Sequence, residues 1–121
     1  ISGNSLSEEE YRSKYSDNTS EVSVKTLNPE ELQAMLPNKN FFLLDVHIPK
    51  QEHIPGTDEF IDYTKLKENE DKLPQDKDEK IVIYCRSGSM SRAASADLIE
   101  MGYTNVYDLQ GGINAFNDLN N

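Results

Sequence analysis

The stretch that decides the fold runs from Ile81 to Met101 and reads IVIYCRSGSMSRAASADLIEM. Its first four residues are apolar and favour extended structure, which is typical of a strand buried on both faces of a parallel sheet. Cys85 ends this strand, and a short run of small and polar residues follows it. A helix is predicted from about Ser91 to Met101, with Gly102 as the residue that ends it. A strand, a tight loop and a helix in this order indicate an α/β fold.

Further strands are predicted on both sides of this unit. Residues 41–46 (FFLLDV) form a second nearly continuous apolar run, as expected of another buried strand. Shorter apolar or alternating segments predict three more strands, at Val22 with Val24, at Phe60 with Ile61, and at Val106–Leu109. The sequence therefore predicts an α/β fold with a mainly parallel sheet.

The other predicted helices connect these strands. Asn28, Pro29 and Glu31 together predict a capped helix start, because the Asn side chain and the Glu side chain each accept an N–H at the first turn. Residues 63–72 predict a short surface helix, and residues 113–119 predict a closing helix after Gly111 and Gly112. In the helix that follows the Cys loop, the side chains of Ala93, Ala94, Leu98 and Met101 are expected on the packed face.

Length, charge and hydropathy limit the classes of protein that remain. The chain has 121 residues, of which 36% are hydrophobic, which is enough for one small core. We expect a polar tether or tail over residues 1–20 and one domain over residues 21–121. The net charge of −10 disfavours nucleic acid and anionic lipid surfaces as partners. No apolar run approaches the length that membrane insertion requires.

Cysteine and histidine counts restrict the chemistry further. A single Cys excludes an internal disulfide, and one Cys with two His makes a structural zinc site improbable, so we predict neither metal nor cofactor. The compartment stays open. The chain begins at Ile1, so the protein is either cytoplasmic or, if an export signal upstream was removed, extracytoplasmic.

The surroundings of Cys85 predict a nucleophile. The carboxyl ends of parallel strands are where α/β folds bind ligands, and Cys85 lies at such an end. Gly88 allows the loop to turn toward the sulfur, and backbone N–H groups at the start of the next helix point outward. Such donors stabilise an anion, and a thiolate is an anion. Arg86 and Arg92 add positive charge. The alternative is an inert Cys buried at the end of a core strand.

Several segments of the chain resemble one known family. Residues 84–94 (YCRSGSMSRAA) are similar to the active-site loop of single-domain rhodanese-like proteins, which are sulfurtransferases. Residues 44–47 (LDVH), residues 53–57 (HIPGT), residues 102–107 (GYTNVY) and residues 109–113 (LQGGI) resemble the other signatures of the same family. The matches occur in the family's order and together cover about residues 22–119.

The resemblance implies a fold, a reaction and a set of site residues. The implied fold is the rhodanese-like parallel sheet of about five strands with helices on both faces. The implied reaction transfers the outer sulfur of a donor, such as thiosulfate or a persulfide, to Cys85, and then to a thiophilic acceptor such as cyanide, a small thiol or a protein thiol. Cys85 would be the catalytic nucleophile. The substrate-binding residues would be Arg86, Ser87, Gly88, Ser89, Met90 and Ser91, with Arg86 attracting anionic donors.

Some positions depart from the family pattern, and others have a role that the resemblance does not fix. Many members carry a basic residue where this chain has Met90, so one anion contact is lost and the affinity for thiosulfate is in question. The family usually has Arg at the position of His47, which we expect to fix the loop. We interpret Asp45 as structural, accepting loop N–H groups, and expect Asp45 and Arg92 to give electrostatic support to the site. His53 is expected to pack in its turn rather than to act as a base.

Two other functions compete with sulfur transfer. A phosphatase uses a similar Cys loop but requires Arg six positions after the Cys, where this chain has Ser91, and Arg92 lies one position too late. The other alternative is a non-enzymatic interaction or redox-sensing domain that has kept the fold.

Overall fold

The computed structural model describes residues 23–119, so the tail predicted over residues 1–20 lies outside the described residues. Five parallel strands form one sheet in the order β1-β5-β4-β2-β3. The strands are β1 (Lys25–Leu27), β2 (Phe42–Asp45), β3 (Glu59–Phe60), β4 (Ile81–Tyr84) and β5 (Val106–Leu109). The predicted α/β fold with a parallel sheet is confirmed, and β4 lies in its centre.

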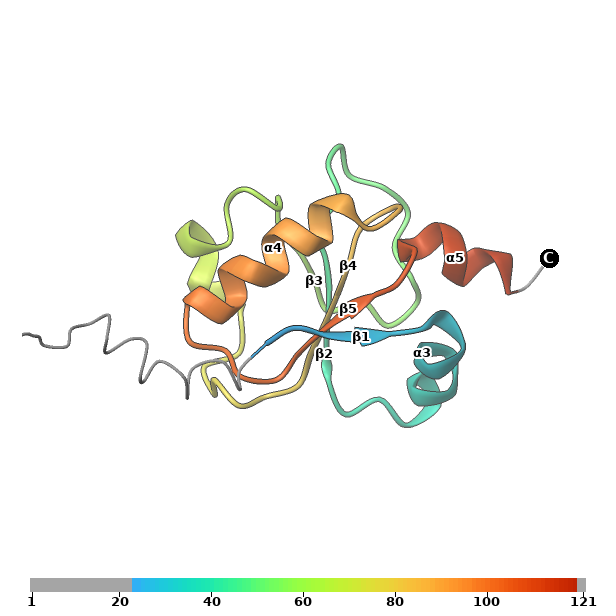
Figure 1. Ribbon diagram of the computed structural model, residues 1–121, viewed down its shortest axis with the longest axis horizontal. Helices are drawn as coiled ribbons and strands as arrows, with labels where there is room; N and C mark the ends of the chain where they lie inside the picture. The colour runs from blue at the N-terminus through green and yellow to red at the C-terminus, as the bar shows by residue number, and fades with distance from the viewer. Residues whose placement is uncertain (1–22, 120–121) are drawn as a thin grey trace, which may run out of the picture.

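Helices cover both faces of the sheet, as predicted (Figure 1). Helix α4 (Ser89–Glu100) and the 3₁₀ helix η2 (Lys67–Lys72) cover one face, while α3 (Pro29–Met35) and α5 (Gly112–Asp118) cover the other. A second short 3₁₀ helix, η1 (Leu36–Asn38), extends α3. Two clusters of buried side chains fill the spaces between these layers. One includes Leu66, Ile83 and Leu98, and the other includes Leu32, Val82 and Phe116.

Local sequence signals account for the helix ends. The Asn28 side chain accepts the Glu31 N–H at 2.8 Å and the Glu31 side chain accepts the Asn28 N–H at 3.0 Å, which is the predicted capping box. At the end of α4, Gly102 adopts a φ of 104° and its N–H donates to the Ile99 carbonyl. The Tyr103 N–H donates to the Leu98 carbonyl, which completes a Schellman motif.

Several predicted boundaries were wrong. The first strand is Lys25–Leu27 rather than Val22 with Val24, because Leu27 is the apolar residue that pairs with β5 and is buried. Strand β3 begins one residue before the predicted Phe60. The helix predicted over residues 63–72 is only the 3₁₀ segment η2.

Helix α4 begins at Ser89, two residues earlier than predicted. The reason is Gly88, whose φ of 124° turns the chain directly into the helix, so that Ser89 and Met90 are helical rather than part of the loop. Ala93 is exposed, contrary to prediction, whereas Ala94 and Leu98 are buried. Within the described residues, no helix has both the length and the apolar character needed to cross a membrane.

Candidate active site

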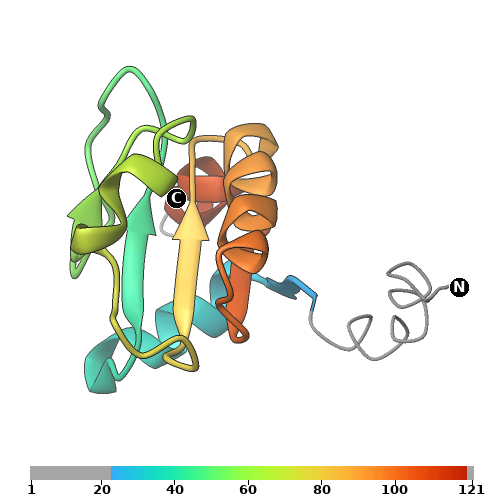
Figure 2. The same ribbon diagram turned by 90° about the vertical axis from the view of Figure 1, so that its left-hand side faces the viewer.

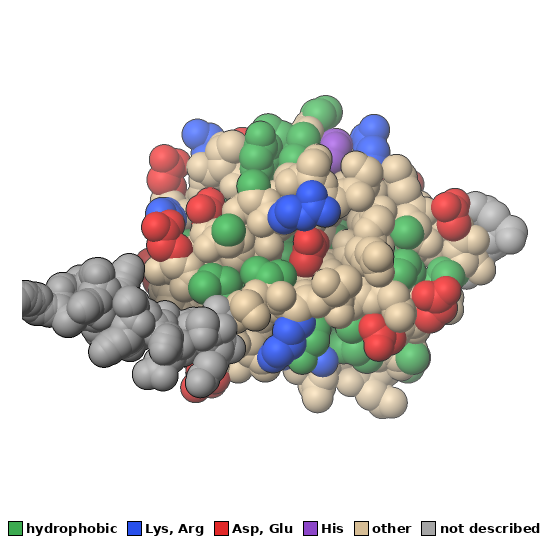
Figure 3. Space-filling model, viewed as in Figure 1, with side chains coloured by type: hydrophobic (Ala, Val, Ile, Leu, Met, Phe, Trp, Pro, Cys, Tyr) green, Lys and Arg blue, Asp and Glu red, His purple; other side chains and the backbone are tan. Residues whose placement is uncertain are grey.

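Cys85 lies directly after β4, at the carboxyl edge of the sheet. The arrows of β2 and β4 point toward the upper edge of the molecule (Figure 2). Hydrophobic side chains and a histidine gather along that same upper edge (Figure 3). The loop from Cys85 to Gly88 therefore lies at the edge of the sheet where parallel α/β folds bind their ligands.

The Cys85 sulfur has two polar partners. The Gly88 N–H donates to Cys85 Sγ at 3.0 Å, so one loop amide is directed at the sulfur. The Ser91 Oγ lies 3.6 Å from Sγ and accepts the thiol hydrogen. Cys85 is only 1% exposed, so the sulfur lies beneath its loop rather than at an open surface. The Cys85 sulfur is thus held by two polar contacts and is almost fully shielded from solvent.

The other predicted binding residues surround Cys85 with different exposures. Arg86, Ser87 and Ser89 are exposed, and Met90 is half-buried against the core. Their assignment to substrate binding, and that of Gly88 and Ser91, stays a prediction.

Helix α5 fixes the backbone of this loop. The Ile113 N–H donates to the Cys85 carbonyl at 2.9 Å, and the Asn114 N–H donates to the Arg86 carbonyl at 3.1 Å. The first turn of α5 therefore satisfies both carbonyls and holds the loop backbone in place. Sequence reasoning assigned Gly111 and Gly112 only to a turn and missed this attachment.

A carboxylate that the sequence analysis did not single out lies behind the loop. Ser91, fully buried, donates its hydroxyl hydrogen to Asp108 Oδ1 at 2.7 Å. Burial raises the pKa of Asp108, although the Ser91 hydrogen bond and the positive charge of Arg92 oppose the change. Asp108 belongs to β5, the neighbour of β4, and the rule that sites form at the ends of adjacent parallel strands could have found it. The predicted supporting role of Arg92 toward Cys85 stays a prediction.

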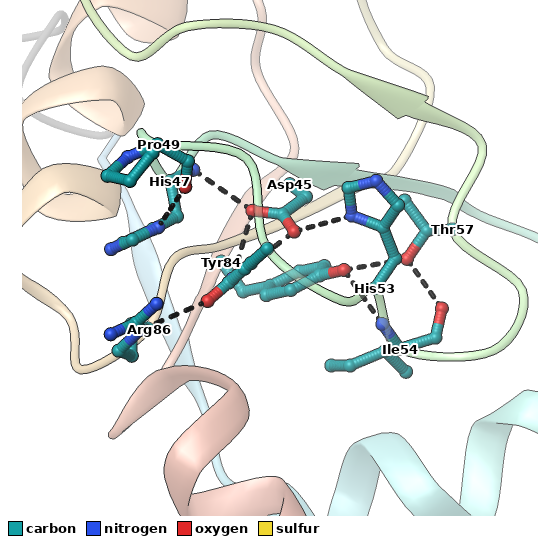
Figure 4. Close-up of polar contacts among 9 residues, drawn as sticks. Asp45, His47, Pro49, His53, Ile54, Thr57, Tyr84 and Arg86 are labelled. Atoms are coloured by element: carbon teal, nitrogen blue, oxygen red, sulfur yellow. Dashed lines mark hydrogen bonds and ion pairs between the residues drawn. The ribbon is translucent and has the colours of Figure 1, made fainter.

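Asp45 is the centre of a second polar cluster, at the end of β2 (Figure 4). The fully buried carboxylate accepts the His47 N–H at 3.0 Å and the Gln51 side-chain amide at 3.2 Å to each oxygen. It also lies 2.7 Å from His53 Nδ1, which therefore carries a hydrogen. Asp45 thus accepts a loop N–H, in line with the structural role that the sequence suggested.

Gln51 connects this cluster to the Cys loop. The Arg86 Nε donates to Gln51 Oε1 at 3.4 Å, so Arg86 is linked through Gln51 to Asp45 (Figure 4). No local pattern in the sequence marks Gln51, because the contact joins residues 35 positions apart. The predicted packing role of His53 is accompanied by a ring contact with Phe60 at 5.9 Å between centroids, but its bond to Asp45 was not predicted.

His47 and Tyr84 hold the loop that follows β2. His47 is buried and its Nδ1 donates to the Pro49 carbonyl at 2.8 Å, which closes the loop on itself. The Tyr84 hydroxyl accepts the Ile54 N–H at 3.0 Å and contacts Thr57 Oγ1 at 2.8 Å. Both residues therefore position backbone rather than face Cys85.

The arrangement brings together the Cys85 thiol, a backbone N–H donor from Gly88, and Arg86, which is held by Gln51. Within residues 23–119, no group of three or more His, Cys, Asp or Glu side chains is arranged to hold a metal ion. Covalent chemistry at Cys85 is what these groups fit best.

Comparison with known proteins identifies relatives of this arrangement. The family model described as Rhodanese-like domain matches residues 28–119. A tRNA uridine(34) hydroxylase from Erwinia tasmaniensis is 38% identical over 96 residues, which cover 72% of this chain and 27% of that protein. An adenylyltransferase and sulfurtransferase from Candida albicans is 33% identical over 101 residues, or 76% of this chain and 23% of that protein. The chain therefore spans about a quarter of the length of these curated relatives.

A solved structure agrees with this result. A rhodanese homolog from Thermus thermophilus superposes with a TM-score of 0.62 at 27% identity, covering 75% of this chain and 99% of that one.

Proposed function

This chain belongs to the rhodanese-like domain family, and on that premise we propose that it is a sulfurtransferase that carries sulfur as a persulfide on Cys85. The observation that supports the proposal most directly is the Gly88 N–H directed at Cys85 Sγ, at the carboxyl end of the central strand. A donor of this kind stabilises negative charge on sulfur both before the reaction and in the persulfide.

The proposed reaction has two transfers. The Cys85 thiolate attacks the outer sulfur of thiosulfate or of a persulfide, a new S–S bond forms, and sulfite or a thiolate leaves with the electrons of the broken bond. A thiophilic acceptor, such as cyanide or a thiolate, then attacks the outer sulfur and releases Cys85 as a thiolate. Arg86, exposed and held by Gln51, attracts anionic donors to the loop.

The single cysteine makes the test of this proposal simple. Incubation with thiosulfate should add the mass of one sulfur atom to the protein, and reduction should remove it. Because the chain has no other Cys, the adduct can form only at Cys85, and Cys85→Ser should abolish it without changing the fold. A wild-type protein that gains no sulfur from thiosulfate or from a small organic persulfide would contradict the proposal.

The near-complete burial of Cys85 is the observation that favours the alternative, a non-enzymatic interaction or redox-sensing domain. The rate of alkylation by iodoacetamide separates the two functions. An enzyme should be alkylated near neutral pH at a rate well above that of a buried, inert thiol, with the denatured chain as the reference for full access. A folded protein that is alkylated only after denaturation would favour the alternative.

A further inference from the structure

Three side chains form one continuous line of hydrogen bonds behind the Cys loop. Cys85 Sγ lies 3.6 Å from Ser91 Oγ, and Ser91 Oγ lies 2.7 Å from Asp108 Oδ1. A hydroxyl has one hydrogen, and the Gly88 carbonyl at 3.2 Å competes for it less well than the nearer carboxylate. The Ser91 hydrogen therefore points to Asp108, and a lone pair of Ser91 faces the sulfur.

This orientation has a consequence for the charge on Cys85. While Asp108 is ionised, Ser91 accepts a hydrogen from the sulfur but cannot donate one to it. A thiolate at Cys85 would then face an oxygen lone pair, with a second negative charge behind it, and like charges disfavour each other's ionisation. When Cys85 is a thiol, Cys85, Ser91 and Asp108 each have a hydrogen-bond partner in this line.

We propose that Asp108 is a positioning residue that acts through Ser91 to hold Cys85 as a thiol and so restrains its reactivity. The inference rests on the proposed function, because only a reacting Cys85 gives this restraint a role. When Asp108 accepts the Ser91 hydrogen, Ser91 takes the hydrogen of the Cys85 thiol. The Ser91 hydroxyl then donates a hydrogen bond to the resulting Cys85 thiolate. The charge on Cys85 is therefore coupled to the charge on Asp108 through the Ser91 hydroxyl.

The surroundings of Asp108 support this coupling. Arg92 from α4 is the charged group that acts on it, and the residues beside it in the sheet, Thr26 on β1 and Ile83 on β4, are uncharged. Burial raises the pKa of Asp108, which makes it a better proton acceptor. Asp108 also lines a cavity of about 190 Å³ together with Ser87, Gly88 and Arg92, and we expect its carboxyl to exchange protons with solvent through this cavity.

The test measures the ionisation of Cys85 against pH in the full chain. Thiolate absorbs in the ultraviolet, and subtraction of the Cys85→Ser spectrum isolates the one cysteine. In Asp108→Asn the thiolate should appear at lower pH, with its population near neutral pH raised on the order of tenfold, because one like charge is removed and the Ser91 hydroxyl is released. Asp78→Asn is the matched control. Asp78 accepts a hydroxyl hydrogen from Thr104 at 2.6 Å, but it precedes β4 at the opposite end of the sheet.

A second variant separates this role from a merely structural one. Ser91→Ala should also raise the thiolate population, because it removes the oxygen that accepts the thiol hydrogen, but it should do so less than Asp108→Asn, because the charge of Asp108 remains. Introduced into Ser91→Ala, the Asp108→Asn change should have a smaller effect than in the wild type. An Asp108→Asn titration at the same pH as the wild type or higher would overturn the inference, as would an undiminished effect in the Ser91→Ala background.

Failure of the proposed function would be visible separately. If no donor transfers sulfur to the wild-type protein, the absorption titration still decides whether Asp108 controls the charge on Cys85.

Discussion

Gly112 packs directly against the backbone of Arg86, so that a methyl group on Gly112 would lie 2.5 Å from the Arg86 carbonyl oxygen. The same methyl would lie 2.6 Å from the Cys85 carbonyl oxygen, and the φ of 64° at Gly112 is itself unfavourable for other residues. The first turn of α5 can bond to the Cys loop only because this position has no side chain.

Replacement of Gly112 by Ala should therefore destabilise the protein and disturb the loop. Backbone strain and the close contacts together should lower the free energy of unfolding by about 2–4 kcal/mol. Urea unfolding measures this loss, and the rate of iodoacetamide reaction at Cys85 reports the loop. Gly102→Ala is the control, since Gly102 also has a positive φ but its nearest neighbour is the end of a Lys77 side chain at 4.0 Å. Equal losses of stability in the two variants would contradict the prediction, because they would show that the positive φ alone, and not the contact with the Cys loop, determines the loss.

Removal of the buried Asp45 carboxylate should lower the free energy of unfolding more than removal of an exposed loop carboxylate. Its carboxylate is fully buried and holds His47, Gln51 and His53, so Asp45→Ala leaves the buried His47 N–H and two half-buried side chains without this acceptor. We expect a loss of about 3–5 kcal/mol in the free energy of unfolding. Asp58→Ala is the comparison, because Asp58 is exposed and accepts from Leu43 N and Lys39 Nζ, and its loss should cost about 1 kcal/mol. Similar losses in the free energy of unfolding for Asp45→Ala and Asp58→Ala would contradict the prediction that burial makes Asp45 the more important carboxylate.

The sheet was predictable because its strands carry strong local signals. Residues 81–84 and 41–46 are nearly continuous apolar runs typical of buried strands, and the structure has strands at Ile81–Tyr84 and Phe42–Asp45. The Asn28 and Glu31 pair predicted its helix start to the residue, since a capping box is a contact between neighbours. β1 was misplaced because Leu27 alone among its residues is buried, which leaves no alternation to detect.

The site was predictable only where its parts are close in sequence. Cys85 and Gly88 lie in one loop, and the Gly88 N–H reaches the sulfur as a turn at that glycine requires. Gln51, Asp108 and Gly112 contact the loop from other elements, and no pattern in one sequence records such contacts. Asp108 was the nearest to being found, because it is the second-last residue of β5, the strand beside β4.

Tyr84 should make stability depend on alkaline pH. Burial raises the pKa of Tyr84 above its usual value, with smaller opposing effects from its hydrogen bonds to Thr57 and Ile54. A raised pKa means that the folded state keeps its proton while the unfolded chain loses it, so stability is intact below about pH 10 and falls as pH rises further.

The variant Tyr84→Phe isolates this effect. At neutral pH it should cost about 1–3 kcal/mol, because the Ile54 N–H loses its acceptor. Above about pH 10 the difference from wild type should shrink, since only the wild type loses stability there. Denaturant unfolding at neutral and alkaline pH measures both. A difference between Tyr84→Phe and the wild type that stays constant from neutral to alkaline pH would contradict the prediction.

Met90 should limit the use of anionic donors. It occupies the position in the loop at which many members of the family carry a basic residue, and it lies in the first turn of α4, half-buried against the core. Met90→Arg places a cation where the donor's negative charge arrives, so the rate of persulfide formation with thiosulfate should rise by about tenfold, while the rate with a neutral organic persulfide should change little.

The control for Met90→Arg adds the same charge one helical turn away. Ala93 is exposed on α4, so Ala93→Arg changes the net charge equally without entering the loop. If both variants accelerate the thiosulfate reaction to the same degree, the effect comes from the general field of an acidic protein, which high salt should abolish. A gain confined to Met90→Arg and retained in salt would instead show that this one position decides which donors the loop accepts, because only a cation in contact with the bound anion escapes screening.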